Sequence, residues 1–152
     1  MNNRTFYKDA HWYVALILGT LFWATLPLLY VEVDFSQREM SFRSLLFGVV
    51  LYPVFEEIMF RGWLQPFLFN KWRFCRIQHA GISGSNVLTS VLFAALHLIN
   101  QSTLWSLSIF FPSLIFGYFR DRYQTLVPSI LLHGLYNLGL ILVFHYLDLT
   151  QN

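Results

Sequence analysis

Long apolar stretches alternate with short polar segments along the chain. A helix needs roughly 20 apolar residues to cross the hydrocarbon core of a bilayer, because each residue adds about 1.5 Å along its axis. Stretches near this length predict five membrane-spanning helices, which we place at about residues 12–31, 42–69, 86–100, 104–119 and 126–147. We therefore expect an all-α fold, a polytopic transmembrane helical bundle that forms a single integral membrane domain over residues 1–152.

The second of these stretches contains a proline. Pro53 has no backbone N–H to donate, and its ring crowds the carbonyl four residues earlier, at Val49. Sharp bends in helices usually occur at such positions. We therefore predict that the second span is kinked or broken near Pro53, just before Glu56. The following segment, residues 70–85, is basic and contains two glycines, which predicts a loop.

The composition agrees with a lipid environment. Hydrophobic residues make up 56% of the chain and charged residues only 12%, about half the share of a typical soluble domain. These fractions make the lipid bilayer the expected surrounding of the chain. The net charge of +2 gives no indication of a nucleic-acid partner. The only cysteine is Cys75, which excludes an internal disulfide and a cysteine-based zinc cluster.

The distribution of Lys and Arg predicts the orientation in the membrane. Short cytoplasmic loops carry an excess of these residues. Five spans with a cytoplasmic N-terminus put two basic residues, Arg38 and Arg43, on the outer side. The same arrangement puts a larger group on the cytoplasmic side: Arg4, Lys8, Lys71, Arg73, Arg76, Arg120 and Arg122. We therefore expect a multi-pass protein with its N-terminus in the cytoplasm.

Several polar residues interrupt the predicted spans. An ionisable side chain at the bilayer centre costs at least about 2.5 kcal/mol, so such residues usually face the interior of a bundle or a wet cavity. The residues that need this explanation are Glu56, Glu57, Arg61, His97, His133 and Asn137. Together they predict a functional site within the membrane.

Helical spacing suggests how these residues are grouped. Glu57 and Arg61 are four residues apart, with the acid first, which favours an ion pair along the helix. Glu56 points about 100° away from Glu57 around the same helix, so it lacks this partner. A carboxylate of this kind can act as a general base towards water. For Glu57 and Arg61, a buried ion pair that positions helices and a direct chemical role both remain open.

The histidines lie on two other predicted spans. His97 is far enough into the third span to meet Glu56 near the middle of the membrane. His133 and Asn137 are one helical turn apart on the fifth span, so both face the same direction. Two such groups could stabilise a developing oxyanion, an effect that is larger where water is scarce.

Three segments carry these residues and together resemble the motifs of a known family. They are Glu56-Glu57-Ile58-Met59-Phe60-Arg61, Phe93-Ala94-Ala95-Leu96-His97 and His133-Gly134-Leu135-Tyr136-Asn137. They are similar to the E-E-x-x-x-R, F-x-x-x-H and H-x-x-x-N motifs of the CAAX-protease and bacteriocin-processing family (CPBP or Abi), which comprises intramembrane glutamic-type endopeptidases. The resemblance covers a core of about residues 45–147.

The resemblance implies roles for the individual residues. Glu56 and His97 would activate a water molecule, His133 and Asn137 would hold the oxyanion, and the ion-pair residues would support the site. The implied reaction is hydrolysis of a peptide bond in a membrane protein or membrane-associated peptide, without a cofactor or a metal ion. A prenylated tail, a peptide precursor and a sorting anchor all remain open as substrates, and the oligomeric state is not predicted.

Two other interpretations use the same polar residues. Glu and His side chains can bind zinc, which would make the chain a metal-dependent intramembrane protease, although no H-E-x-x-H pair is present. The chain could instead be non-catalytic, as an immunity or partner-binding protein or a small proton-relay carrier. Activity that depends on Glu56 and His97 distinguishes the protease from the non-catalytic proteins.

Overall fold

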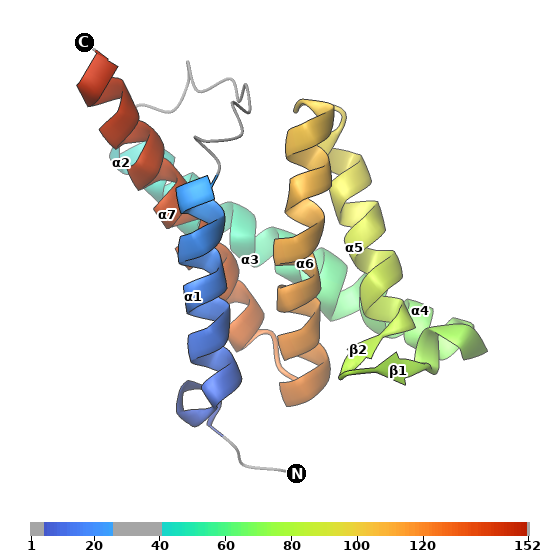
Figure 1. The fold of residues 1–152 in the computed structure, drawn as a ribbon. Coiled ribbons are helices and arrows are strands. Elements are labelled where there is room, and N and C mark those ends of the chain that lie inside the picture. The colour runs from blue at the N-terminus through green and yellow to red at the C-terminus, as the bar shows by residue number, and fades with distance from the viewer. Residues whose placement is uncertain (1–4, 26–40, 152) are drawn as a thin grey trace.

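Helices make up most of the described chain. The computed structural model describes residues 5–25 and 41–151, with side chains as far as Tyr146. The elements, shown in Figure 1, are a 3₁₀ turn Phe6–Lys8, α1 Ala10–Thr25, α2 Phe42–Leu45, α3 Tyr52–Glu57, α4 Gln65–Lys71, a 3₁₀ turn Arg73–Arg76, β1 Gln78–His79, β2 Ile82–Ser83, α5 Gly84–His97, α6 Thr103–Tyr123 and α7 Val127–Gln151. π-helical segments Leu46–Leu51 and Ile58–Leu64 join α2, α3 and α4.

The predicted all-α class is confirmed, apart from the small antiparallel hairpin that pairs Gln78 with Ser83. Within the described residues, only Val127–Tyr146 is long and apolar enough to count as a membrane span by itself. The helices Ala10–Thr25 and Gly84–His97 are apolar but shorter. Residues 26–31 of the first predicted span lie outside the described residues, so the number of spans stays a prediction.

Two predicted boundaries differ from the structure. α5 ends at His97, so residues 98–100 form a turn instead of the end of a span. α6 continues through the charged group at residues 120–122, where we had placed its end, and stops only before Gln124. Gln124 has a φ of 56°, a left-handed conformation that ends helices.

The chain remains helical across Pro53, so the second predicted span is not broken there. The preceding π-helical segment accommodates the proline. The N–H of Tyr52 donates to the carbonyl of Phe47, five residues earlier, and Pro53 has no N–H to donate. The carbonyl of Gly48 therefore lacks a donor from its own helix. It accepts a hydrogen bond from Nδ2 of Asn137 on α7 instead, at 2.8 Å.

The same arrangement occurs again further along this helix. The N–H of Gln65 donates to the carbonyl of Phe60, five residues earlier, and the next residue is Pro66. The carbonyl of Arg61 is thereby left without a donor from its own helix. It accepts a hydrogen bond from Nε of Arg120 on α6, at 3.0 Å. Each proline thus leaves one carbonyl of the long helix free to accept a hydrogen bond from a neighbouring helix.

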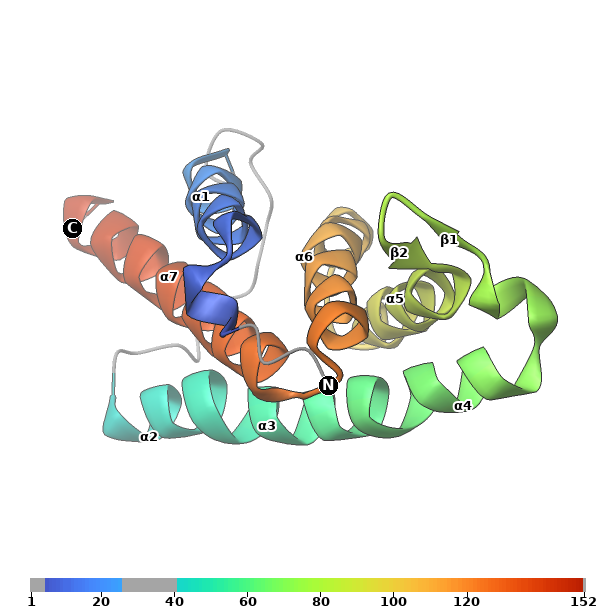
Figure 2. The same cartoon turned by 90° about the horizontal axis from the view of Figure 1, so that it is seen from below.

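The long helix formed by α2, α3 and α4 runs along one side of the molecule, as Figure 2 shows, and α7, α6 and α5 pack against it. α1 lies in the angle between α6 and α7.

In the contact between α1 and α7, aromatic rings pack against glycines of the facing helix. A Cβ on Gly19 would lie 2.6 Å from the ring of Tyr136, and a Cβ on Gly139 would lie 2.2 Å from Trp23. Both glycines therefore allow close packing of these two helices.

A polar cluster joins the first turn of α1 to the last turn of α6. One carboxylate oxygen of Asp9 accepts hydrogen bonds from Arg122 and Tyr123, at 2.7 and 2.6 Å. The other accepts from the backbone N–H of His11, which caps the start of α1. The hydrogen bond from Tyr123, with further donors from His11 and Arg122, lowers the pKa of Asp9 below its usual value.

Candidate active site

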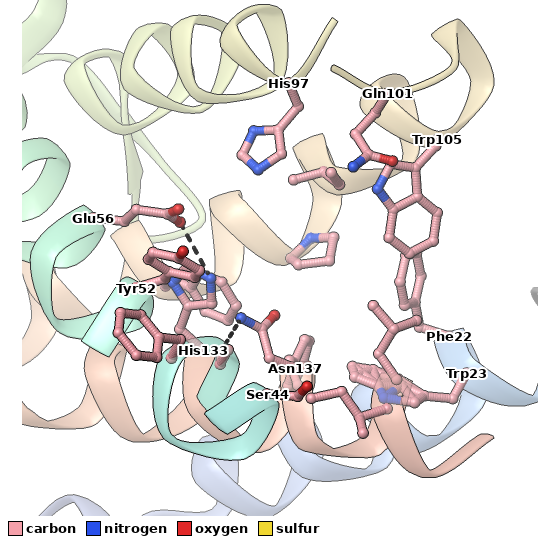
Figure 3. A pocket seen from close by; sticks show the side chains of 18 of the residues that line it. Phe22, Trp23, Ser44, Tyr52, Glu56, His97, Gln101, Trp105, His133 and Asn137 are labelled. Carbon is pink, nitrogen blue, oxygen red and sulfur yellow. Dashed lines mark hydrogen bonds and ion pairs between the residues drawn. The ribbon is translucent and has the colours of Figure 1, made fainter. Parts of the chain in front are cut away.

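A single cavity of about 890 Å³ is lined by the four residues to which the resemblance assigns catalysis. Glu56 comes from α3, His97 from the end of α5, and His133 and Asn137 from α7 (Figure 3). One wall is polar and contains Glu56, His133 and Asn137, and His97 lies across the cavity from Glu56. The opposite wall is largely aromatic and includes Phe22, Trp23 and Trp105.

Glu57 and Arg61 form the predicted ion pair beneath this cavity. Nη1 of Arg61 donates to Oε1 of Glu57 at 3.0 Å, and both side chains are fully buried. Nη2 of Arg61 also donates to the carbonyl and the hydroxyl of Ser113, at 3.0 and 2.6 Å. The guanidinium carbon lies 4.8 Å from the centre of the Phe93 ring. Arg61 therefore ties the long helix to α5 and α6.

The ion pair also fixes the orientation of His133. Nδ1 of His133 lies 2.9 Å from the same Oε1 of Glu57. A carboxylate only accepts hydrogen bonds, so the proton of this bond belongs to Nδ1 and the other ring nitrogen, Nε2, is turned to the cavity. The ring is stacked on Phe116, with centres 4.9 Å apart. Nε2 lies 3.5 Å from Oε2 of Glu56.

Glu56 differs from its neighbour in its exposure. Its side chain is 35% exposed and lines the cavity, whereas Glu57 is fully buried. The difference follows from the rotation of about 100° between adjacent helical residues. Of the two glutamates, Glu56 is therefore the one that water or a substrate can reach.

His97 faces the same open space from the last turn of α5 (Figure 3). Its Nδ1 lies 2.8 Å from the carbonyl of Phe93, one turn earlier. A carbonyl also only accepts, so Nδ1 carries the proton and Nε2 is free to accept one in the neutral ring. The helical positions predict that Glu56 and His97 can meet near the middle of the membrane. In the structure Oε2 of Glu56 lies 3.5 Å from Nε2 of His133, and His97 lies across the cavity.

Asn137 uses one hydrogen of its amide for the carbonyl of Gly48. An amide nitrogen has two hydrogens, so the second is available to the cavity. Because Pro53 leaves the Gly48 carbonyl without a helical donor, the same proline that we expected to bend the helix also positions Asn137. Within the part of the chain that the structure describes, no group of three or more His, Cys, Asp or Glu side chains is arranged to hold a metal ion.

Sequence reasoning missed a second polar layer below the ion pair. Gln65 is almost fully buried, and its Nε2 donates to Oδ1 of Asp121 at 2.7 Å. The hydroxyl of Ser83 donates to the other carboxylate oxygen, at 2.6 Å. Gln65 follows Arg61 by four residues, so the same spacing that paired Glu57 with Arg61 would have placed all three side chains on one face.

The comparisons with known proteins agree with the three motifs. The family model for Rce1-like proteins, described as type II CAAX prenyl endopeptidase Rce1-like, matches residues 38–139, which contain all three motifs. The UPF0177 protein YbdI of Lactococcus lactis subsp. lactis (strain IL1403) is 34% identical over 98 residues, or 64% of this chain. These residues are 46% of that protein, so the chain spans about half the length of the curated relative. No solved structure matches. The expected family is confirmed: the chain belongs to the Rce1-like family of type II CAAX prenyl endopeptidases, within the CPBP group.

Proposed function

We propose that this protein is an intramembrane endopeptidase that hydrolyses a peptide bond of a membrane-associated protein or peptide. The observation that carries the proposal is the common cavity of Glu56, His97, His133 and Asn137 in a chain of a protease family. A carboxylate that can accept a proton, a second base and two hydrogen-bond donors can together activate water and stabilise the oxyanion formed in peptide hydrolysis.

The proposed setting is a multi-pass arrangement of five spans with a cytoplasmic N-terminus and a bend of the second span near Pro53. Large apolar side chains on the outside of the bundle support a lipid environment, among them Phe55 and Phe111, each 65% exposed. The asymmetric distribution of Lys and Arg supports the orientation.

In the first step, a water molecule held between Glu56 and His97 attacks the carbonyl carbon of the substrate. Glu56 accepts the proton as the new C–O bond forms. The free Nε2 of His97 orients the water by accepting its other hydrogen. The exposure of Glu56 to the cavity supports its role as the base.

In the second step, His133 and Asn137 stabilise the oxyanion of the tetrahedral intermediate. The second amide hydrogen of Asn137 donates to this oxygen. Nε2 of His133 donates to it only when the ring carries both protons, since Nδ1 already donates to Glu57. The C–N bond then breaks, and the proton held by Glu56 passes to the leaving nitrogen, which yields an acid and an amine.

Loss of the base tests this proposal. We expect Glu56→Gln to reduce cleavage by a factor of about 10² to 10⁴ without changing the fold, because the amide cannot accept the proton of water. The measurement compares the termini of membrane proteins from cells that express the wild-type or the variant chain, by peptide mass spectrometry. His97→Ala should lose the same cleavage products. Arg73→Gln, at an exposed site far from the cavity, serves as the control that retains them.

Cleavage products that are unchanged in both Glu56→Gln and His97→Ala would reject the assigned roles. Immunity or partner binding that persists in these variants, without any cleavage product in the wild type, would favour the non-catalytic interpretation. Activity that disappears with a chelator and returns with zinc would favour the metal-dependent one.

A further inference from the structure

A second cavity, of about 550 Å³, lies between α1 and α6 and contains none of the proposed catalytic residues. Most of its lining residues are apolar, among them Val14, Leu18 and Leu21 of α1 and Phe111, Ile115 and Phe119 of α6. Its floor is buried, since Ala15 and Phe119 are 2% and 1% exposed. Its rim is open, since Leu18 and Leu21 are 46% and 56% exposed. We call this cavity the apolar groove.

The apolar groove follows the axes of the two helices that form it. The ring of His11 contacts that of Tyr118, and the ring of Phe22 contacts that of Trp105, so α1 and α6 are antiparallel (Figure 1). The lining extends from His11 to Thr25 on α1, a length of about 21 Å at the helical rise per residue. One leaflet of the hydrocarbon core is about 15 Å deep, half of the whole. The groove can therefore hold one extended acyl chain over the depth of a leaflet.

One end of the apolar groove is polar and basic. His11 and Tyr118 line this end, with ring centres 5.8 Å apart. The guanidinium carbon of Arg122 lies 5.8 Å from the centre of the Tyr118 ring. Asp9 contacts Nε and Nη2 of Arg122, and a guanidinium has five N–H donors, so Arg122 can bind a second anionic group. Lys8, which is exposed, precedes His11 by three residues.

The other end of the groove is apolar. Leu21 and Phe111 line it, and they are 56% and 65% exposed. The groove thus changes along its length from a basic end to an exposed apolar end. A ligand that matches this change has a negative charge at one end and a hydrocarbon chain at the other.

We propose that the apolar groove binds one acyl chain of an anionic phospholipid, whose phosphate is held by Arg122 and Lys8. The proposal rests on the membrane setting proposed above and not on the protease function. Basic residues near the membrane surface attract anionic lipids, and the guanidinium of Arg122 suits a phosphate. The hydrocarbon chain then covers Leu18 and the buried floor of the groove.

The bound lipid affects the shape of the catalytic cavity. Phe22, Pro112 and Tyr136 line both that cavity and the apolar groove. The acyl chain packs on these side chains and on α1 and α6 together, so it stabilises the position of α1. The aromatic wall that α1 contributes to the catalytic cavity is stabilised with it.

Photocrosslinking tests the proposal without requiring cleavage. The purified chain is reconstituted in phosphatidylcholine bilayers that contain a trace of phosphatidylglycerol with a diazirine in its acyl chain, and peptide mass spectrometry maps the crosslinked residues. We expect crosslinks to concentrate on residues that line the groove, such as Leu18 and Ile115. The same diazirine on phosphatidylcholine should give about fivefold fewer crosslinks there, the factor that one basic residue near the surface contributes.

Matched variants test the two parts of the site. Leu18→Trp fills the groove and should remove most of the crosslinks. Ile17→Trp is its control, because Ile17 is 60% exposed on the same helix but is not among the residues that line the groove. Lys8→Gln should reduce the preference for phosphatidylglycerol. Lys71→Gln, at an exposed site at the end of α4, should retain it.

Equal crosslinking by the two headgroups would overturn the proposal, and so would crosslinks spread evenly over the exposed residues of all helices. Loss of crosslinks in Ile17→Trp to the same extent as in Leu18→Trp would do the same. Crosslinks between two copies of the chain at Leu18 would assign the groove to self-association instead. Competition by unlabelled phosphatidylglycerol in the wild-type chain measures the preference even if a variant fails to fold. The expected lipid preference in a chain that cleaves nothing would reject the protease function and leave the lipid site in place.

Discussion

The oxygen atom Oε1 of Glu57 connects the charge pair to the proposed catalytic residues. It accepts from Arg61 and from His133, and His133 in turn reaches Glu56. Glu57 and Arg61 are both fully buried, so no water replaces a lost partner there, and the geometry of His133 depends on a charge that is itself compensated. Glu57 is fully buried, and its connection to the cavity is the hydrogen bond with His133.

Removal of the guanidinium should therefore be costly. We expect Arg61→Met to lower the free energy of unfolding by about 3 to 5 kcal/mol, because it leaves the buried carboxylate of Glu57 without its cation. Denaturation of the purified protein in detergent measures the change. Arg73→Met, which removes an exposed guanidinium from the 3₁₀ turn, is the matched control and should change stability by less than about 0.5 kcal/mol. Equal effects of the two substitutions would contradict the importance of the buried pair.

The sequence predicted which side chains gather at the site but not which atoms they share. Burial cost identified all six residues, and helical spacing identified the pair of Glu57 with Arg61. The contact of Glu56 with His133 was not predicted, because it depends on how far α7 is displaced along the long helix. That displacement is set by packing between residues distant in sequence, such as Gly134, whose Cβ would lie 2.6 Å from the carbonyl of Val49.

At the level of whole helices, the contact between α1 and α7 combines the small residues common at helix interfaces in membranes with aromatic rings packed on them. Tyr136 packs on Gly19 of α1, and its hydroxyl donates to the carbonyl of Ala15 at 2.5 Å. Tyr136 lies between His133 and Asn137 in the third motif. The position of α1 is therefore coupled directly to the turn of α7 that carries two proposed catalytic residues.

Filling one of these glycine positions should separate the two helices. We expect Gly139→Ala to destabilise the protein by about 1 to 3 kcal/mol, since the new methyl group overlaps the indole of Trp23. Thermal unfolding in detergent measures the change. Gly48→Ala serves as the control, because its Cβ would make only an ordinary contact of 3.4 Å with Ile141. This control should stay within about 1 kcal/mol of the wild type. Similar stability of Gly139→Ala and the wild type would show that α1 shifts freely.

Apolar stretches located the helices well, whereas their ends and internal turns depended on single interactions. The end of α6 moved beyond its charged residues because Arg120 and Asp121 find partners in neighbouring helices. The π-helical segments were not predicted, since their apolar residues also suit an ordinary helix. The residues that could have indicated the π-helical segments are Pro53 and Pro66, but a proline in a helix is equally compatible with a simple bend.

On the scale of the whole molecule, α1 lies outside the region shared with the family. The family match begins at residue 38, and α1 ends at Thr25. Even so, α1 supplies Phe22 and Trp23 to the wall of the cavity. Its attachment to the rest of the bundle therefore affects both the stability of the protein and the shape of the space that a substrate would enter.

The polar cluster at the start of α1 makes part of this attachment dependent on pH. The folded state lowers the pKa of Asp9, so its stabilising effect is complete above the unfolded pKa of about 3.9 and is lost as the pH falls below it. We expect Asp9→Asn to lower the unfolding temperature at pH 7 by roughly 2 to 4 °C for each kcal/mol lost. The difference from the wild type should shrink between about pH 4 and pH 2. A difference that stays constant over this range would assign the effect to packing alone.

The two carbonyls that the prolines release have a consequence for how the helices stay aligned. A regular helix in lipid satisfies its backbone groups internally, so its carbonyls do little to align the neighbouring helices. The long helix instead exposes an acceptor at Gly48 and another at Arg61, which Asn137 and Arg120 occupy. A shift of α7 or α6 by one residue would break one of these hydrogen bonds. The prolines thereby help to fix the register of the helices, and Asn137, the proposed oxyanion donor, is aligned by a main-chain atom that no side-chain substitution at Gly48 removes.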